Sequence, residues 1–158
     1  SSDPLSTATL IPSRSSMKFA ENGRMLVVDA SCLVEQLVSG PRSRAVESAL
    51  SHDADWVAPC AVDLEVLAVI QRHWRRGDLD DMTAALAVRE LQTWPARRIP
   101  HGPLIPLAWQ MRHYIRAADA LYVALAQQLQ CPLITLDARL ARAVEIEVLV
   151  PGGTGSGS

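Results

Sequence analysis

Residues 25–31 read MLVVDAS, a short apolar run that ends on an aspartate and a serine. Such a run is typical of a buried parallel strand, here ending just before Asp29. The same order returns in LITLD, residues 133–137, with Asp137 in the place of Asp29. Because parallel strands end at one edge of a sheet, the two runs predict a sheet with acidic groups at its carboxyl edge.

Outward from these two runs, the apolar pattern alternates between strands and helices. We expect strands at Met25–Val28, Trp56–Ala58, Arg97–Ile99, Leu133–Thr135 and Glu147–Val150. We expect helices at Ala30–Val38, Arg42–Leu50, Ala61–Arg75, Leu79–Thr93, Leu104–Tyr114, Ala118–Gln130 and Ala138–Ala143. Strands separated by helices require right-handed crossovers. The expected fold is therefore α/β, a three-layer α/β/α sandwich with a mostly parallel central sheet.

The length and composition bound the organisation of the chain. A chain of 158 residues, 49% hydrophobic and 20% charged, suits one globular domain. We expect that domain at residues 25–151, after a flexible Ser- and Thr-rich extension at 1–24 and before a flexible Gly/Ser tail at 152–158. No apolar run approaches the roughly 18 residues that span a bilayer. We therefore expect no membrane association and a cytoplasmic location.

The remaining composition restricts the kind of site. The four histidines and three cysteines have no spacing typical of a zinc site or a disulfide framework. A metal ion in this protein would therefore be held by oxygen atoms. The formal net charge of -2 does not by itself indicate a nucleic-acid binder.

Four acids, considered one at a time, have simple structural explanations. Asp29 and Asp137 each precede a helix and could cap it. Asp119 opens a helix that is apolar on every face, so it needs a partner, which Arg116 could provide. Glu65 lies in the middle of a helix, where no cap explains it, and its simple alternative is a solvent-facing position. These alternatives stay open for each residue alone.

Considered together, the four acids favour a cation site. Asp29, Asp137 and Asp119 should meet at one sheet edge, and Glu65 can reach it from the helix after the second strand. Two ionised carboxylates about 5 Å apart repel by roughly 3 kcal/mol at an effective dielectric near 20, so four together need a cation. All-oxygen ligation favours Mg²⁺ or Mn²⁺ over zinc.

Several strings have the order and spacing of one protein family. They are VVDAS (27–31), EV (65–66), PHGPL (100–104), ADALYVALA (118–126) and LITLDARLA (133–141). In this order they closely resemble VapC toxins, which are PIN-domain ribonucleases of bacterial toxin-antitoxin pairs. The resemblance runs from Met25 to about Val150.

The resemblance implies a doubly wound fold and metal-dependent endonucleolytic cleavage of RNA, with tRNA or rRNA loops as the expected substrates. It also implies a homodimer, a cognate antitoxin and a toxin-antitoxin hetero-oligomer. By motif position the catalytic and metal-binding residues would be Asp29, Glu65, Asp119 and Asp137, with Ser31 and Thr135 as polar support. Ala118 and Gln127 depart from the Tyr and Glu common in relatives, which puts the choice of substrate in doubt.

The RNA would be bound by residues outside the acidic quartet. Arg112, His113 and Arg116 lie just before Asp119 and are the expected phosphate contacts, with a solvated helix face as the alternative. Trp109 is expected in the core or in a dimer contact rather than as a platform for a base. Weaker candidates for RNA contact are Arg72, Arg75, Arg76, Arg97 and Arg98.

Two other functions compete with the nuclease. An aspartyl-phosphate phosphatase would use Asp29 as its nucleophile, but that chemistry usually needs a second aspartate two residues later, where Ser31 stands. A catalytically silent module could serve only to bind an antitoxin. The complete set of four acids argues against the silent module.

Overall fold

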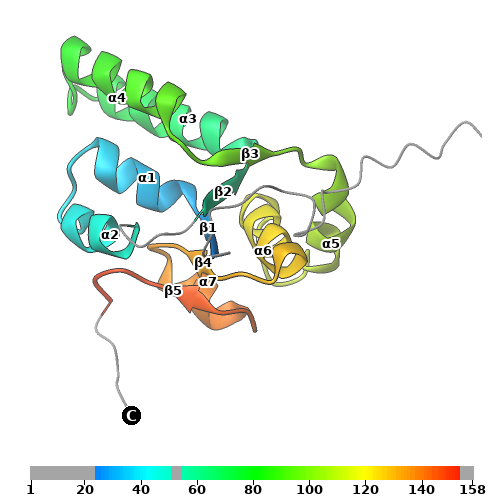
Figure 1. The fold of residues 1–158 in the computed structure, drawn as a ribbon. Coiled ribbons are helices and arrows are strands. Elements are labelled where there is room, and N and C mark those ends of the chain that lie inside the picture. The colour runs from blue at the N-terminus through cyan, green and yellow to red at the C-terminus, as the bar shows by residue number, and fades with distance from the viewer. Residues whose placement is uncertain (1–23, 51–54, 154–158) are drawn as a thin grey trace, which may run out of the picture.

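A parallel five-stranded sheet lies at the centre of the computed structural model, which describes residues 24–50 and 55–153 (Figure 1). The strands are β1 (Met25–Val28), β2 (Asp55–Pro59), β3 (Arg97–Ile99), β4 (Leu133–Ile134) and β5 (Val148–Leu149), in the order β3-β2-β1-β4-β5. Each of these four strand pairings is parallel. The predicted α/β sandwich is therefore confirmed.

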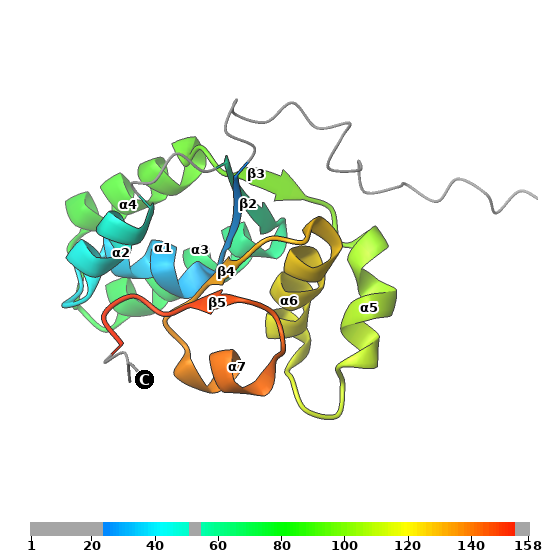
Figure 2. The same cartoon turned by 60° about the horizontal axis from the view of Figure 1, so that its bottom comes forward.

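Helices cover both faces of this sheet. One face carries α1 (Ala30–Leu37), α2 (Ser43–Leu50), α3 (Ala61–Arg75) and α4 (Asp81–Thr93), as Figures 1 and 2 show. The other carries α5 (Ile105–Gln110) and α6 (Ala117–Leu129), and α6 packs against β1, β2 and β4. A short helix, α7 (Ala138–Ala143), follows β4. Because α6 is buried on nearly every side, its all-apolar sequence is explained.

Some predictions concern residues beyond this description. The expected flexible extension at 1–24 lies almost wholly outside the described residues, as does most of the expected tail at 152–158. Within residues 24–50 and 55–153, none of the helices has the length and apolar character that crossing a membrane requires.

The helix predicted at Leu104–Tyr114 was wrong in extent. A short 3₁₀ helix, Gly102–Leu104, precedes α5, and α5 ends at Gln110. After that point the backbone amides of Met111 and Arg112 bond three residues back rather than four. Such tight turns do not continue an α-helix, so a loop connects α5 to α6.

The carboxyl ends of β1 and β4 form the topological switch point of the sheet. These strands are neighbours, with Val28 paired to Ile134, but the chain continues from β1 to one side of the sheet and from β4 to the other. Ligand sites of open α/β sheets lie at such switch points. Asp29 follows β1 directly, and its backbone amide donates to the Ile134 carbonyl at 3.0 Å. The topology therefore places Asp29 at the switch point.

Arg98, a weaker candidate for RNA contact, serves the fold instead. Its guanidinium donates to both carboxylate oxygens of Asp63 in α3, with the shortest distance 2.9 Å. It also donates to the backbone carbonyls of Leu91, Trp94 and Ala96 at 2.6–2.8 Å. These bonds join β3 to α3 and to the end of α4. The Arg98 guanidinium is therefore already hydrogen-bonded within the protein.

Candidate functional site

Asp29 is the centre of the candidate site. Its side chain is only 7% exposed, yet it is ionisable. Its Oδ2 atom accepts hydrogen bonds from the Ser31 hydroxyl at 2.6 Å and the Thr135 hydroxyl at 2.8 Å. The two residues expected as polar support therefore contact Asp29 directly, and they hold its carboxylate in one orientation.

The two hydroxyls also tie the ends of β1 and β4 together. Ser31 Oγ accepts from the Leu136 amide at 3.0 Å, and Thr135 Oγ1 accepts from the Asp137 amide at 3.1 Å. Thr135 is completely buried. Both hydroxyls therefore use their donor and acceptor capacity, and the chain following β4 is fixed relative to Asp29.

Burial raises the pKa of Asp29 above its ordinary value, because water no longer solvates the ionised form. The hydroxyls of Ser31 and Thr135 oppose this change, while the negative charge of Asp119 adds to it. The environment therefore disfavours a negative charge here unless a positive charge is close. A bound cation would provide that charge.

Glu65 is the acid that α3 contributes to the candidate site. Its Oε1 accepts a hydrogen bond from the hydroxyl of Tyr122, a fully buried residue of α6, at 2.9 Å. Burial raises the pKa of Glu65, the Tyr122 hydroxyl lowers it, and the charges of Asp29 and Asp119 raise it. The solvent-facing alternative for Glu65 is thus wrong. The partner was missed, although a buried tyrosine hydroxyl in an apolar helix usually has one.

Asp119 pairs with Arg116, the partner that the sequence analysis named as its structural alternative. The Arg116 Nε donates to Asp119 Oδ2 at 3.0 Å, with the carboxylate side chain 15% exposed and the guanidinium 81% exposed. This hydrogen bond is the main cause of a raised Arg116 pKa, and the charges of Asp137 and Glu65 contribute further. Arg116 therefore lies within the electrostatic reach of three of the four acids.

Asp137 also caps a helix, which was its structural alternative. Its Oδ1 accepts from the backbone amides of Arg139 at 2.9 Å and Leu140 at 3.3 Å, which caps α7. This cap does not exclude a second role, because a carboxylate has further lone pairs. Its backbone amide donates to Thr135 Oγ1, which itself donates to Asp29, so Asp137 lies at the same edge of the sheet.

The four acids share one edge without forming a closed cluster. Within residues 24–50 and 55–153, no three His, Cys, Asp or Glu side chains are grouped closely enough to hold a metal ion. Glu65, Asp119 and Asp137 each turn toward a partner of their own. The donor set is nevertheless all oxygen and anionic, which fits a hard divalent cation such as Mg²⁺ or Mn²⁺.

His101 contributes a contact that the sequence did not reveal. Its Nε2 accepts a hydrogen bond at 2.8 Å from the backbone amide of Ala61, the first residue of α3. This amide is one of the unpaired donors at a helix start, so His101 completes the helix one turn before Glu65. His101 therefore fixes the start of the helix that presents Glu65.

The residues expected to contact RNA lie in the region between α5 and α6. Arg112, His113 and Arg116 are all exposed. The Arg112 guanidinium lies over the Trp109 ring, 4.9 Å from its centroid. Trp109 is 66% exposed, so of its two expected places the core is wrong, while a dimer contact stays a prediction. Exposed arginines beside an exposed aromatic ring are a common composition of nucleic-acid surfaces.

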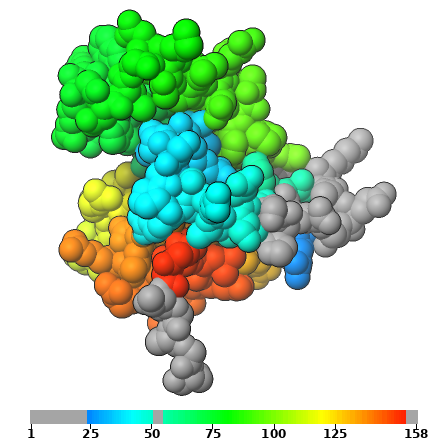
Figure 3. Space-filling model, turned by 90° about the vertical axis from the view of Figure 1, so that its left-hand side faces the viewer, coloured from blue at the N-terminus to red at the C-terminus, as the bar shows by residue number. Residues whose placement is uncertain are grey.

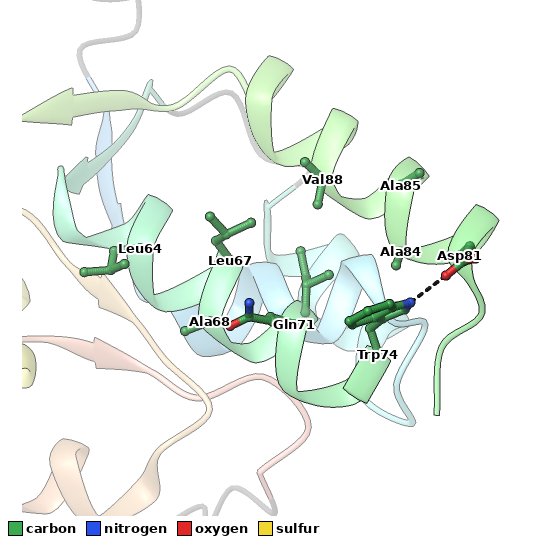
Figure 4. Close-up of a pocket in the computed structure, with 10 residues that line it drawn as sticks. Leu64, Leu67, Ala68, Gln71, Trp74, Asp81, Ala84, Ala85 and Val88 are labelled. Atoms are coloured by element: carbon green, nitrogen blue, oxygen red, sulfur yellow. Dashed lines mark hydrogen bonds between the residues drawn. The ribbon is translucent and has the colours of Figure 1, made fainter. Parts of the chain in front are cut away.

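A second hollow surface lies between α3 and α4, away from the acids. We call it the α3–α4 groove; its volume is about 530 Å³, and its lining includes Leu64, Leu67, Trp74 and Val88 (Figure 4). The Trp74 indole nitrogen donates to Asp81 at 2.6 Å and links the two helices. Figure 3 shows α3 and α4 as a lobe standing above α1 and α2. Leu64 is 71% exposed, so much of this apolar surface has no cover within the described chain.

Comparison with protein families finds one match to most of the chain. The family model of the PIN domain matches residues 26–146. Ribonuclease VapC12 of Mycobacterium tuberculosis is 36% identical over 129 residues, which are 79% of this chain and 99% of the relative. Ribonuclease VapC3 of the same species is 40% identical over 119 residues, which are 75% and 86% of the two chains.

Comparison with solved structures finds the same fold in other proteins. FitAcB from Neisseria gonorrhoeae aligns with a TM-score of 0.66 at 20% identity and covers 82% of this chain and 99% of the other. VapBC2 from Rickettsia felis, bound to a DNA fragment from their promoter, aligns at 0.58 and 11% identity and covers 80% and 98%. At these identities the likeness shows the fold alone.

Proposed function

The chain belongs to the VapC group of PIN-domain ribonucleases, and we propose that it is the endoribonuclease toxin of a type II toxin-antitoxin system. The observation that supports this function most is the buried Asp29, held by two hydroxyls at the switch point, with the charge of Asp119 acting on it. The reaction would be hydrolysis of RNA phosphodiester bonds. We expect it to take place in the cytoplasm, which contains the RNA substrates.

We assign the catalytic cation, Mg²⁺ or Mn²⁺, to the acidic quartet. Asp29, Glu65 and Asp119 would hold it, with Asp137 binding directly or through water. When bound, the cation would polarise the phosphoryl oxygen and lower the pKa of the attacking water. The raised pKa values of Asp29 and Glu65 support this assignment, since both ionise more readily beside a positive charge.

The chain's own residues prepare this site in distinct ways. Ser31 and Thr135 orient Asp29, and Tyr122 orients Glu65. Arg116 donates to Asp119 and balances its charge. Once Asp119 serves as a cation ligand, the exposed Arg116 guanidinium is free to bind an RNA phosphate next to the acids. We assign phosphate binding to Arg112, His113 and Arg116.

The competing phosphatase is disfavoured by the surroundings of Asp29. That chemistry usually needs a second carboxylate two residues after the nucleophile, and Ser31, whose hydroxyl donates to Asp29 Oδ2 at 2.6 Å, holds that place. Single-stranded loops of tRNA or rRNA suit the site better, because their phosphates and unstacked bases are accessible.

The proposal is tested by incubating the purified protein with total tRNA or rRNA in Mg²⁺ or Mn²⁺ and, separately, in excess chelator. We expect discrete fragments with 5′-phosphate and 3′-hydroxyl ends, and no cutting in chelator. Full cleavage in chelator would contradict the metal-dependent mechanism. Hydrolysis of small phosphomonoesters with intact RNA would instead support the phosphatase.

We propose that the cognate antitoxin inserts an amphipathic helix into the α3–α4 groove. The groove exposes a run of apolar side chains along a helix pair, which is the surface that such a helix recognises. The solved complexes with this fold support a protein partner. A homodimer, and with the antitoxin a hetero-oligomer, is also expected from the family.

This partner proposal predicts the effect of a charge in the groove. Leu67→Asp should weaken binding of the protein encoded by the adjacent gene by about a hundredfold, because a carboxylate would be buried against an apolar helix. Met82→Asp is the matched control, since Met82 is exposed on α4 but does not line the groove. Equal affinities of wild type and Leu67→Asp, measured by titration calorimetry, would refute this placement.

A further inference from the structure

We propose that the hollow between α5 and α6 binds one unpaired nucleobase of the RNA, stacked on Trp109 and adjacent to the carboxylates. We call this hollow the α5–α6 pocket. This inference rests on the proposed nuclease function and adds to it a specificity subsite. It concerns a residue, Trp109, whose role the acidic quartet does not explain.

The α5–α6 pocket has the size and composition of a base-binding site. Its volume is about 450 Å³, and its lining includes His101, Trp109, Arg112, Ile115, Arg116 and Leu121. Its lining combines apolar side chains with cationic and aromatic groups. Ligand pockets commonly combine an apolar lining with a few placed polar groups in this way.

Trp109 gives this pocket a flat stacking surface. The indole is 66% exposed, so it contributes little to the core. The Arg112 guanidinium lies 4.9 Å from the ring centroid, and its Nη1 donates to the Trp109 carbonyl at 3.0 Å. The planar pair is thus held in place before a ligand arrives. Bases stack on aromatic rings and on guanidinium planes alike.

The position of Arg116 connects the α5–α6 pocket to the acids. Arg116 lines the pocket and also donates to Asp119 at 3.0 Å. A nucleotide whose base occupies the pocket would therefore have its phosphate one side chain away from the quartet. The base bound in the pocket would then determine which phosphate of an RNA loop reaches the acidic quartet.

The charge of the α5–α6 pocket favours RNA over a second copy of the chain. Among the described residues, its lining contains Arg112, Arg116 and His101 but no carboxylate. A two-fold dimer places the same patch of both copies face to face. That contact would bring like-charged arginines together, whereas an RNA strand supplies the phosphates that neutralise them.

A thermodynamic cycle tests this inference on a short single-stranded RNA that spans a cleavage site. Binding is measured by fluorescence anisotropy in Mg²⁺ with Asp29→Asn protein, so that the RNA stays intact. We expect Trp109→Ala to weaken binding about tenfold. Removing the base at one position of the RNA should weaken binding to the protein that retains Trp109 by a similar factor. The two changes together should weaken binding little more than either change alone. Trp109→Phe should retain most of the affinity.

Tyr114→Ala is the matched control, because Tyr114 is an exposed aromatic residue near the pocket but outside its lining. The inference is overturned if Trp109→Ala binds RNA normally, or if its loss is independent of every base. It is also overturned if Trp109→Ala converts a dimer to a monomer in sedimentation with RNA affinity unchanged. Cleavage by the wild-type protein is measured separately. If the RNA is cut but no base shows coupling to Trp109, only the base-binding subsite is refuted. If the RNA is neither bound nor cut, the nuclease function is refuted.

Discussion

Asp29→Asn is expected to reduce RNA cleavage in Mg²⁺ by roughly a thousandfold or more, which corresponds to about 4 kcal/mol of lost transition-state stabilisation. The substitution keeps the shape of the side chain and removes its charge. The carbonyl oxygen of asparagine can still accept from Ser31 and Thr135, so the ends of β1 and β4 stay joined. The loss should therefore appear in catalysis and not in folding.

Stability measurements separate these two effects. Because burial raises the pKa of Asp29, its negative charge is disfavoured in the folded, metal-free protein. Asp29→Asn should consequently melt no lower than wild type in chelator. Asp78→Asn is the control, since that exposed carboxylate pairs with His73 and does not belong to the acidic quartet. Undiminished cleavage by Asp29→Asn would contradict a catalytic role for this residue.

The part of the site closest to the sheet could be predicted from the sequence. Short apolar runs placed Asp29 and Asp137 after β1 and β4, and parallel strands bring such positions to one edge. Ser31 and Thr135, each two residues from one of these acids, were expected as polar support from the family resemblance. The structure places both hydroxyls on Asp29.

Contacts between distant elements could not be predicted in the same way. The bond from Tyr122 to Glu65 depends on how α6 packs beside α3, and the bond from Ala61 to His101 depends on the path of the loop after β3. Arg98 resembles other surface arginines in sequence, but its carbonyl partners come from the end of α4 and the following loop. Such partners are defined only by the tertiary arrangement.

The exposure of Trp109 could not be predicted from the sequence either. Large aromatic residues are usually buried, which made a place in the core or in a dimer contact a reasonable expectation. However, α5 stops at Gln110, and the loop that follows leaves the indole exposed. The end of α5 is set by backbone bonds three residues back, which apolar periodicity does not predict.

The central claim, a cation site formed by the acidic quartet, has a defined pH dependence. Burial raises the pKa of both Asp29 and Glu65, and neighbouring acids raise them further. Their protonated forms are therefore favoured in the folded, metal-free protein. Their contribution to stability is greatest below the ordinary pKa and decreases as pH rises through the raised values. A bound cation reverses this penalty, so its stabilising effect should increase toward neutral pH.

The most direct measurement is thermal unfolding at neutral pH in chelator and in millimolar Mn²⁺, for wild type, Asp119→Asn and Asp78→Asn. At a hundred times its dissociation constant a ligand contributes about 2.7 kcal/mol, which corresponds to a rise of roughly 5–10 °C for a domain of this size. We expect that rise for wild type and Asp78→Asn, and less than half of it for Asp119→Asn. An unchanged melting temperature of wild type in Mn²⁺, or an equal rise in Asp119→Asn, would contradict the cation site.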